Sequence, residues 1–442
     1  MSTKATGKTE EKSSTGITAI SVAGYKSLSR PQRLEIKPLT LLAGANSSGK
    51  SSAIQPLLLL KQTMDSTYDA GPLLLNGPNV RFTSADQLLS RMDSSAQANE
   101  LRVGAEAGPE RKIELIFRRR PGKRLDLDLM TYTDLRGTLS LSQHMSEDEI
   151  RKSLPAALWG TIKGIMNQSA LTARWTVIRD RCFLTLSIAD PDQRASLSVT
   201  DKNLREEIQR IIHVPALRGN PERAYPKTAV EQNFPGTFDK YVASIVALWQ
   251  SDKDRRLRQL NQALQELGLT STVKARPVDE TQIELQVGRL PSTSRQKDQD
   301  LVNIADVGYG VSQVLPVIIA LLVAAPGQLV YVEQPEIHLH PRAQAALAKI
   351  LADGAERGVR VVVETHSTVL LLALQTLVAE GKLAPNLVKL HWFSRQKDGS
   401  TDISSADIDE SGAFGDWPVD FADVLQETES RYLDAAEESL VR

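Results

Sequence analysis

Eight consecutive residues, Gly44-Ala45-Asn46-Ser47-Ser48-Gly49-Lys50-Ser51, have the types and spacing needed to bind phosphate. The two glycines let the backbone turn so that its N–H groups point at phosphate oxygens. The lysine can reach the β- and γ-phosphates, and the serine hydroxyl is placed to bind magnesium. We therefore predict Mg-ATP binding, with Ser51 as a metal ligand. The predicted nucleotide-binding residues of this P-loop are Gly44, Asn46, Ser47, Ser48, Gly49, Lys50, Ser51 and Ser52.

A second candidate site follows the apolar run 328–332, which ends in the carboxylate of Glu333. A carboxylate at the end of a buried strand is the usual second magnesium contact of P-loop ATPases, so Glu333 is a predicted metal ligand. The next residues, 334–341, contain prolines at 335 and 341, which favour a rigid turn. His338 and His340 could instead form a metal pair, but two histidines without a third ligand rarely make a site.

A third polar turn, Glu364-Thr365-His366-Ser367, follows the apolar run 361–363. A neutral imidazole can both donate and accept a hydrogen bond, so His366 is a candidate for orienting the attacking water. The alternative is a helix-capping turn with an incidental histidine. Ser367 could cap the following helix in either case.

The stretch 305–316 is rich in glycine and leads into an apolar helix. Glycines allow close backbone approach to phosphate, and a helix N-terminus favours anions. This stretch looks like a variant of the signature sequence of ABC-type ATPases, and that resemblance makes Gly308, Gly310 and Ser312 further candidate nucleotide contacts. The alternative is a plain glycine-rich turn in which the serine caps the helix.

The elements around these motifs predict an α/β fold. Strands are expected at 17–22 and 34–42, and the P-loop leads into a helix at 51–64. The C-terminal third alternates regularly between strands and helices, which is typical of a parallel sheet. Those strands are expected at 328–332, 359–363 and 387–393, with helices at 342–352 and 368–377.

We interpret the chain as a P-loop ATPase core, a mixed sheet flanked by helices, interrupted by an α+β lobe. The expected segments are a disordered tail (1–16), the N-terminal part of the core (17–95), the inserted lobe (96–290), the C-terminal part of the core (291–395) and a tail element (396–442).

The motif Glu333–Pro341 resembles that of ABC-type ATPases of the structural-maintenance-of-chromosomes (SMC) and overcoming-lysogenization-defect (OLD) kind. Their usual pattern is four apolar residues, then Asp, Glu, Pro, Glu, an apolar residue, His, Leu, His and Pro. Here Glu333 stands in place of the aspartate and Gln334 in place of the catalytic glutamate. An amide cannot accept a proton from water, and general base catalysis contributes about 10²–10⁴-fold. Either hydrolysis is slow, or another carboxylate, Glu336 being the nearest, takes the role.

The same resemblance implies that His366 contacts the γ-phosphate. It also implies that the helix after Gly308 caps ATP bound by a second subunit, so that the active unit is a dimer or a higher homo-oligomer. The stretches 213–225 and 412–421 look like those of a narrower prokaryotic group with a C-terminal domain of unknown function. Members of that group often work in anti-phage systems beside an effector protein, a nuclease or other toxin.

Composition limits the remaining function classes. The net charge of −1 gives no global attraction to nucleic acid. The cluster Arg118–Arg124 could still contact nucleic acid phosphates, although a solvated hairpin tip is the simpler reading. The single cysteine, Cys182, fits a reducing, cytoplasmic setting. The longest apolar run, 314–325, is too short to span a membrane.

Three functions compete at this point. The first is an ATPase whose dimer closes and opens to control a partner. The second is an ATP-gated scaffold that hydrolyses little, which Gln334 keeps open. The third is a nuclease of the OLD type, which is disfavoured because we identify no Glu followed by an Asp-x-Asp on predicted strands after His366.

Overall fold

A computed structural model describes most of the chain, and we restrict structural statements to those residues. They are 16–91, 97–120, 125–160, 162, 174–189, 196–199, 202–216, 218–289, 300–415 and 430–431. The expected N-terminal tail, apart from Gly16, and most of the segment after residue 415 lie outside them.

The central sheet contains six strands in the order β11-β16-β17-β3-β18-β19. The first five run parallel, and β19 pairs antiparallel with β18 at one edge. The bounds are β11 Ile212–Val214, β16 Leu329–Glu333, β17 Arg360–Glu364, β3 Leu39–Gly44, β18 Val388–Arg395 and β19 Thr401–Asp407. The predicted parallel α/β core is confirmed.

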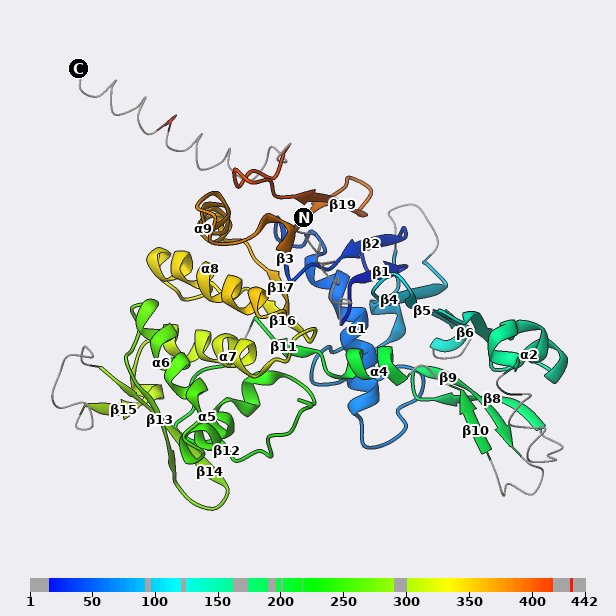
Figure 1. Cartoon of the computed structure of the whole chain (residues 1–442), viewed down its shortest axis with the longest axis horizontal. Coiled ribbons are helices and arrows are strands. Elements are labelled where there is room, and N and C mark those ends of the chain that lie inside the picture. The colour runs from blue at the N-terminus through cyan, green and yellow to red at the C-terminus, as the bar shows by residue number, and fades with distance from the viewer. Residues whose placement is uncertain are drawn as a thin grey trace, which may run out of the picture.

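Helices cover both faces of this sheet, and its central strands β16, β17 and β3 are accordingly apolar and buried. On β16, Val330 and Val332 pack into the hydrophobic cluster that includes α7 and α8, while Leu329 and Tyr331 pack into the cluster that includes α1. The bounds are α1 Lys50–Asp65, α7 Tyr309–Val323, α8 Pro341–Glu356 and α9 Thr368–Ala379. Figure 1 shows α1 on one side of the sheet and α7 to α9 on the other.

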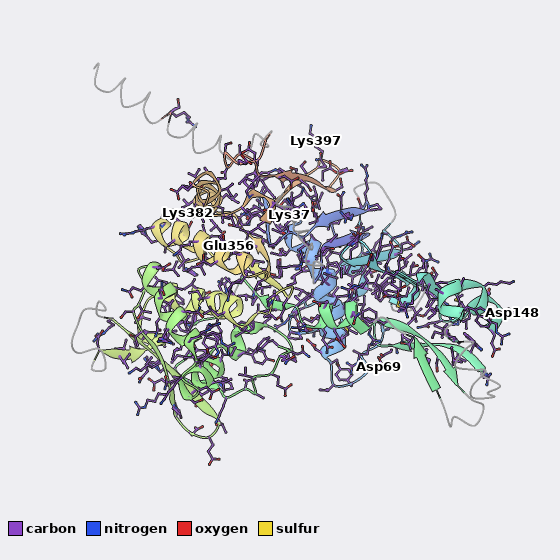
Figure 2. The ribbon with its side chains drawn as sticks, viewed as in Figure 1. Lys37, Asp69, Asp148, Glu356, Lys382 and Lys397 are labelled. Carbon is purple, nitrogen blue, oxygen red and sulfur yellow. The ribbon has the colours of Figure 1, made fainter. Side chains whose placement is uncertain are left out.

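A second, antiparallel sheet has the order β2-β1-β4-β5-β6-β7. Its bounds are β1 Ala19–Ala23, β2 Gln32–Glu35, β4 Glu100–Ala107, β5 Arg111–Arg119, β6 Leu125–Asp134 and β7 Gly137–Leu141. This sheet extends toward an arm of short elements, and Asp148 lies near the tip of that arm (Figures 1 and 2). The elements of the arm are α2 Glu147–Ser153, β8 Arg174–Asp180, β9 Phe183–Ala189 and β10 Ser196–Val199. The helix α4 (Lys202–Gln209) packs against α1.

A third group of elements packs against α7 on the opposite side of the molecule (Figure 1). It consists of α5 Val242–Ser251, α6 Arg255–Glu266, β12 Tyr225–Pro226, β13 Val273–Pro277, β14 Gln282–Gly288 and β15 Leu301–Asn303. Short 3₁₀ turns occur at Ala85–Gln87, Phe238–Tyr241, Ile304–Asp306 and Pro385–Leu387.

Three expectations need correction. The strand predicted at 34–42 is two strands in different sheets, β2 and β3, because Pro38 between them has no N–H to continue a ladder. The segment 396–442, expected to be a tail element, contributes the edge strand β19 to the core sheet. The sheets also cross the expected lobe boundaries, since β4 to β7 extend the sheet of β1 and β11 pairs with β16.

Candidate functional site

The P-loop connects the end of β3 to the start of α1, as predicted. Gly44 has φ 139°, and a Cβ added there would lie 2.3 Å from the carbonyl oxygen of Phe393. Gly49 has φ 104°, and a Cβ there would lie 2.8 Å from the hydroxyl oxygens of Ser27 and Thr401. Only glycine fits either position, so the loop curves tightly around space that a phosphate can enter.

Two residues far from the loop in sequence support it. The Thr401 hydroxyl donates a hydrogen bond of 2.7 Å to the Ser48 carbonyl oxygen and contacts the Ser27 hydroxyl at 2.8 Å. The Thr401 N–H also donates to the Ser27 carbonyl oxygen. The edge strand β19 therefore holds the loop in shape.

Lys50 and Ser51 begin α1, and both are engaged by protein atoms. The Lys50 ammonium donates to the carbonyl oxygens of Gly44 at 3.1 Å and Ala45 at 2.8 Å. Burial lowers its pKa, while nearby Glu364 and Glu336 oppose this shift. The Ser51 hydroxyl donates a hydrogen bond of 3.0 Å to Oε1 of Glu364.

The P-loop forms one wall of an open cavity of about 1060 Å³. The opposite wall is the turn after β16, and the ends of β17 and β18 complete it. Five of the predicted site residues line this cavity together, namely Gly44, Asn46, Gln334, Glu336 and His366. The structure therefore brings the P-loop, the turn 334–341 and the histidine turn to one place.

The turn 334–341 is rigid, as its prolines predict. Gln334 and His338 adopt positive φ angles of 44° and 64°, which non-glycine residues rarely do. Nδ1 of His340 accepts from the N–H of Arg342 and caps α8, which begins at Pro341. The ring of His338 instead lies 5.5 Å from that of Tyr309. Among the residues described, no group of three or more His, Cys, Asp or Glu side chains could hold a metal, so the histidine-pair alternative finds no support.

Glu336 is buried beside His366. Its Oε1 accepts from the Thr365 hydroxyl and from the His366 N–H, both at 2.9 Å, while Oε2 has no hydrogen-bond partner. Burial raises the pKa of this carboxyl. Burial and the nearby Lys50 charge lower the pKa of His366, which keeps its imidazole neutral.

Glu333, the predicted metal ligand, is held by the segment after β11. Its Oε1 lies 3.2 Å from Nε2 of His213, and its Oε2 accepts from the N–H of Ala216 at 3.1 Å. The Arg218 guanidinium donates to the Glu333 carbonyl oxygen at 2.8 Å. Burial favours a higher Glu333 pKa, but hydrogen bonds from His213, Ala216 and Tyr331 bring the net shift downward.

Sequence reasoning missed four residues of this region: Glu364, His213, Thr401 and Tyr331. Glu364 carried a usable signal, because it ends an apolar strand in the same way as Glu333 does. The others carried none, because each acts through a contact between distant parts of the chain.

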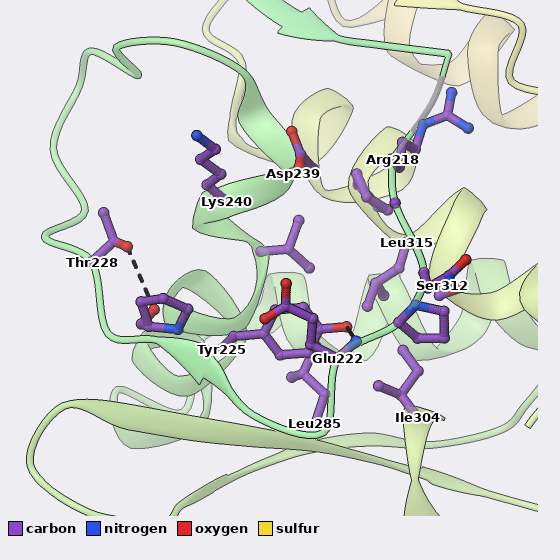
Figure 3. A pocket seen from close by; sticks show the side chains of 16 residues that line it. Arg218, Glu222, Tyr225, Thr228, Asp239, Lys240, Leu285, Ile304, Ser312 and Leu315 are labelled. Carbon is purple, nitrogen blue, oxygen red and sulfur yellow. Dashed lines mark hydrogen bonds between the residues drawn. The ribbon is translucent and has the colours of Figure 1, made fainter. Parts of the chain in front are cut away.

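The glycine-rich stretch lies at the exposed N-terminus of α7, which begins at Tyr309 with Gly308 as its N-cap. Gly308, Gly310 and Ser312 do not line the P-loop cavity of the same chain. Ser312 instead donates to the Tyr309 carbonyl oxygen and borders a second cavity of about 670 Å³. Figure 3 shows that the guanidinium of Arg218, which also borders this cavity, extends away from it.

The basic cluster Arg118–Arg124 is described only up to Arg120. Arg118 pairs with Glu100 and Asp128, Arg119 pairs with Asp86, and Arg120 lies 3.8 Å from Asp128. These carboxylates offset the positive charge of the three arginines.

The residues present fit ATP and magnesium. The start of the P-loop, Gly44 to Asn46, faces an open cavity, and the Ser51 hydroxyl with a neighbouring carboxylate supplies the hard oxygen ligands that magnesium prefers. Magnesium bound with a nucleotide needs only one or two protein carboxylates, since phosphate oxygens and water complete its shell.

A family comparison agrees with this geometry. Residues 199–373 match the family model described as "AAA domain, putative AbiEii toxin, Type IV TA system". This stretch is therefore similar to an AAA domain. It contains α7, the turn 334–341 and His366, while the P-loop precedes it in the chain. This match to an AAA domain supports the expected relation to ABC- and SMC-like ATPases. The sheet topology confirms the predicted α/β fold class. No curated protein matches the sequence significantly.

Solved structures that resemble this chain include SMC heads. The SMC head bound to the C-winged helix domain of ScpA is 13% identical, with a TM-score of 0.49, and the match covers 90% of this chain and 99% of that one. The SMC head domain from Thermotoga maritima is 12% identical, with a TM-score of 0.42 and coverage of 89% and 100%. A head with coiled coil from Pyrococcus yayanosii is 10% identical, with a TM-score of 0.47 and coverage of 94% and 99%. With TM-scores below 0.5, these likenesses carry no argument about function. Within the described part of the chain, no helix is long and apolar enough to cross a membrane.

Proposed function

We propose that this chain is an Mg-ATP-dependent ATPase whose ATP-bound form dimerises and thereby controls a partner protein. The observation that supports this best is that the P-loop, Gln334, Glu336 and His366 line one cavity. In this proposal the γ-phosphate lies in that cavity, between the P-loop, the carboxylate of Glu336 and the neutral imidazole of His366.

In this proposal, Glu336 acts as the general base. Its Oε2 is buried without a hydrogen-bond partner among the described residues, so we propose that it accepts a proton from a water held beside bound ATP, and its raised pKa brings the carboxyl closer to the working pH. His366 orients the water or contacts the γ-phosphate, and Gln334 contributes a hydrogen bond but no proton acceptance. Magnesium would neutralise charge on the β- and γ-phosphates.

The dimer part of the proposal rests on α7. Its N-terminus is exposed beside the turn 334–341, with Gly310 next to His338 and no atom within 4 Å of a Cβ built on Gly308. A free helix N-terminus flanked by glycines can approach phosphate closely. Because it does not line the cavity of its own chain, we assign it to the ATP of a second copy.

Binding and hydrolysis are tested directly by isothermal titration with ATP and magnesium and by a steady-state phosphate-release assay. We expect ATP binding by the wild type and slow but measurable release that depends on magnesium. Absence of nucleotide binding to the folded wild type would rule out the proposal.

Dimerisation is tested by light scattering with a non-hydrolysable ATP analogue. We expect Tyr309→Arg to remain a monomer, because Tyr309 is 46% exposed at the tip of α7. Tyr68→Arg is the matched control, since Tyr68 is also exposed, at 63%, and precedes Asp69 beyond the far end of α1 (Figure 2). If both variants dimerise like the wild type, α7 does not form the interface.

A scaffold that binds but hardly hydrolyses ATP remains the second candidate, and Gln334 is the observation that favours it. A wild type as inactive in phosphate release as Lys50→Ala, yet still dimerising with ATP, would support it. Plasmid nicking by the purified chain would instead indicate a nuclease. The identity of the controlled partner, for which we propose an effector in anti-phage defence, is tested by co-purification from the native host with and without ATP.

A further inference from the structure

Two glutamates end neighbouring parallel strands of the core sheet. Glu333 ends β16 and Glu364 ends β17, and their Cα atoms are direct partners in the strand register. Both are therefore near the P-loop, and either could serve as the carboxylate that accompanies Ser51 at a magnesium ion. Their surroundings differ.

Glu364 is the one in contact with the P-loop. Its Oε1 accepts from the Ser51 hydroxyl at 3.0 Å and its Oε2 accepts from the Tyr331 hydroxyl at 2.8 Å. The residue is 5% exposed. The sheet order explains the contact, since β17 pairs directly with β3, which leads into the P-loop, whereas β16 lies one strand further away.

The carboxylate oxygens of Glu333 are instead hydrogen-bonded to residues outside the P-loop. Nδ1 of His213 lies 3.0 Å from the amide nitrogen of Asn79, which also donates to the Gly236 carbonyl oxygen. An amide nitrogen can only donate, so Nδ1 of His213 accepts and its Nε2 carries the proton. His213 thus donates to Oε1 of Glu333, and Ala216 donates to Oε2. Both oxygens of Glu333 are used to fasten β11 and the segment after it.

We propose that Glu364, and not Glu333, is the protein carboxylate that binds the magnesium of Mg-ATP together with Ser51. Tyr331 orients Glu364, and Glu333 acts as a structural anchor for His213 and Ala216. This inference rests on the proposed Mg-ATP binding and specifies which residues of the site hold the metal. The ligands are a hydroxyl and a carboxylate oxygen, as magnesium requires.

The test uses Mn²⁺ as a paramagnetic substitute for Mg²⁺. Free Mn²⁺ is measured by electron paramagnetic resonance while the full chain is titrated in the presence of a non-hydrolysable ATP analogue. Glu364→Gln and Glu333→Gln are matched variants, because each removes one charge at the same level of the sheet. We expect Glu364→Gln to weaken Mn²⁺ binding by about 10–100-fold and Glu333→Gln by less than about 3-fold.

Two further variants and two kinds of control measurement complete the test. Glu364→Asp, which keeps the carboxylate, should recover part of the affinity, and Tyr331→Phe should weaken it less than Glu364→Gln does. Circular dichroism and thermal melting check that each variant is folded, and titration of the analogue in EDTA checks that its P-loop still binds nucleotide.

Equal losses in the two glutamine variants, or a larger loss for Glu333→Gln, would overturn the assignment. Normal Mn²⁺ binding by Glu364→Gln would also overturn it. A wild type that binds no nucleotide at all would instead contradict the proposed function, so the two failures can be told apart.

Discussion

The hydroxyl of Ser51 donates a hydrogen bond of 3.0 Å to the carboxylate of Glu364, a residue 313 positions away in the chain. This contact joins the first turn of α1 to the end of β17. It places an acidic group where the P-loop would hold magnesium, on a different strand from the one that the sequence motif indicates.

Lys50→Ala should weaken ATP binding by about 10–100-fold, because a hydrogen bond to a charged group contributes about 1.5–3 kcal/mol. The Lys50 ammonium already lies against the P-loop carbonyl oxygens of Gly44 and Ala45, so it needs only a short movement to reach a phosphate. Isothermal titration measures the change. The control is Lys382→Ala, an exposed lysine remote from the cavity (Figure 2), which should bind ATP normally.

Glu336→Gln should lower the rate of ATP hydrolysis by about 10²–10⁴-fold while leaving nucleotide affinity nearly unchanged. Gln334→Glu should raise the rate, since it adds a second carboxylate to the same cavity. Phosphate release under saturating ATP measures both, with the exposed Glu356→Gln as control (Figure 2). Hydrolysis by Glu336→Gln at the wild-type rate would show that Glu336 is not the base.

Hydrolysis should fall as the pH is lowered, and it should do so at a higher pH than an ordinary glutamate would cause. Burial raises the Glu336 pKa above its usual 4.5, and only the deprotonated form can accept a proton from water. The same loss should be absent from Glu336→Gln, whereas burial and Lys50 shift the pKa of His366 downward from its usual value. A profile of kcat against pH measures the effect, and a flat profile down to the usual glutamate range would contradict it.

Asp65→Asn should destabilise the fold by roughly 3–5 kcal/mol, because it leaves a buried lysine without its charged partner. Lys61 has a fully buried side chain that donates to Asp65 at 2.9 Å and to the Gln209 carbonyl oxygen at 2.8 Å. Urea unfolding measures the change in the free energy of unfolding.

Two further variants test whether burial of the Lys61–Asp65 pair causes this loss of stability. Adding Lys61→Met to Asp65→Asn should recover much of the stability, since no buried charge remains. Glu266→Gln, which breaks the exposed pair with Lys349, should cost less than about 1 kcal/mol. Equal losses at the buried and the exposed pair would contradict the argument.

The central α/β architecture was readable from local patterns, because buried parallel strands are continuous apolar runs and the turns between them carry prolines and glycines. Strands β16 and β17 and helices α8 and α9 occur where periodicity predicted them. The sequence-based prediction of strands was wrong at the two edges of the core sheet. β11 and β19 are a short strand and a polar strand, and each belongs to the core through its neighbour rather than through its own composition.

The sequence by itself determined the P-loop, because phosphate binding there depends on contiguous backbone and on two glycines that tolerate positive φ. It also indicated Glu336 and His366 as candidates, since each follows an apolar strand. Only the tertiary structure decided which carboxylate meets Ser51. Sheet order sets that choice, and the partners of the Glu333 carboxylate come from β11 and the segment after it, more than a hundred residues away in the chain. Long-range hydrogen bonds of this kind leave no periodic trace in the chain.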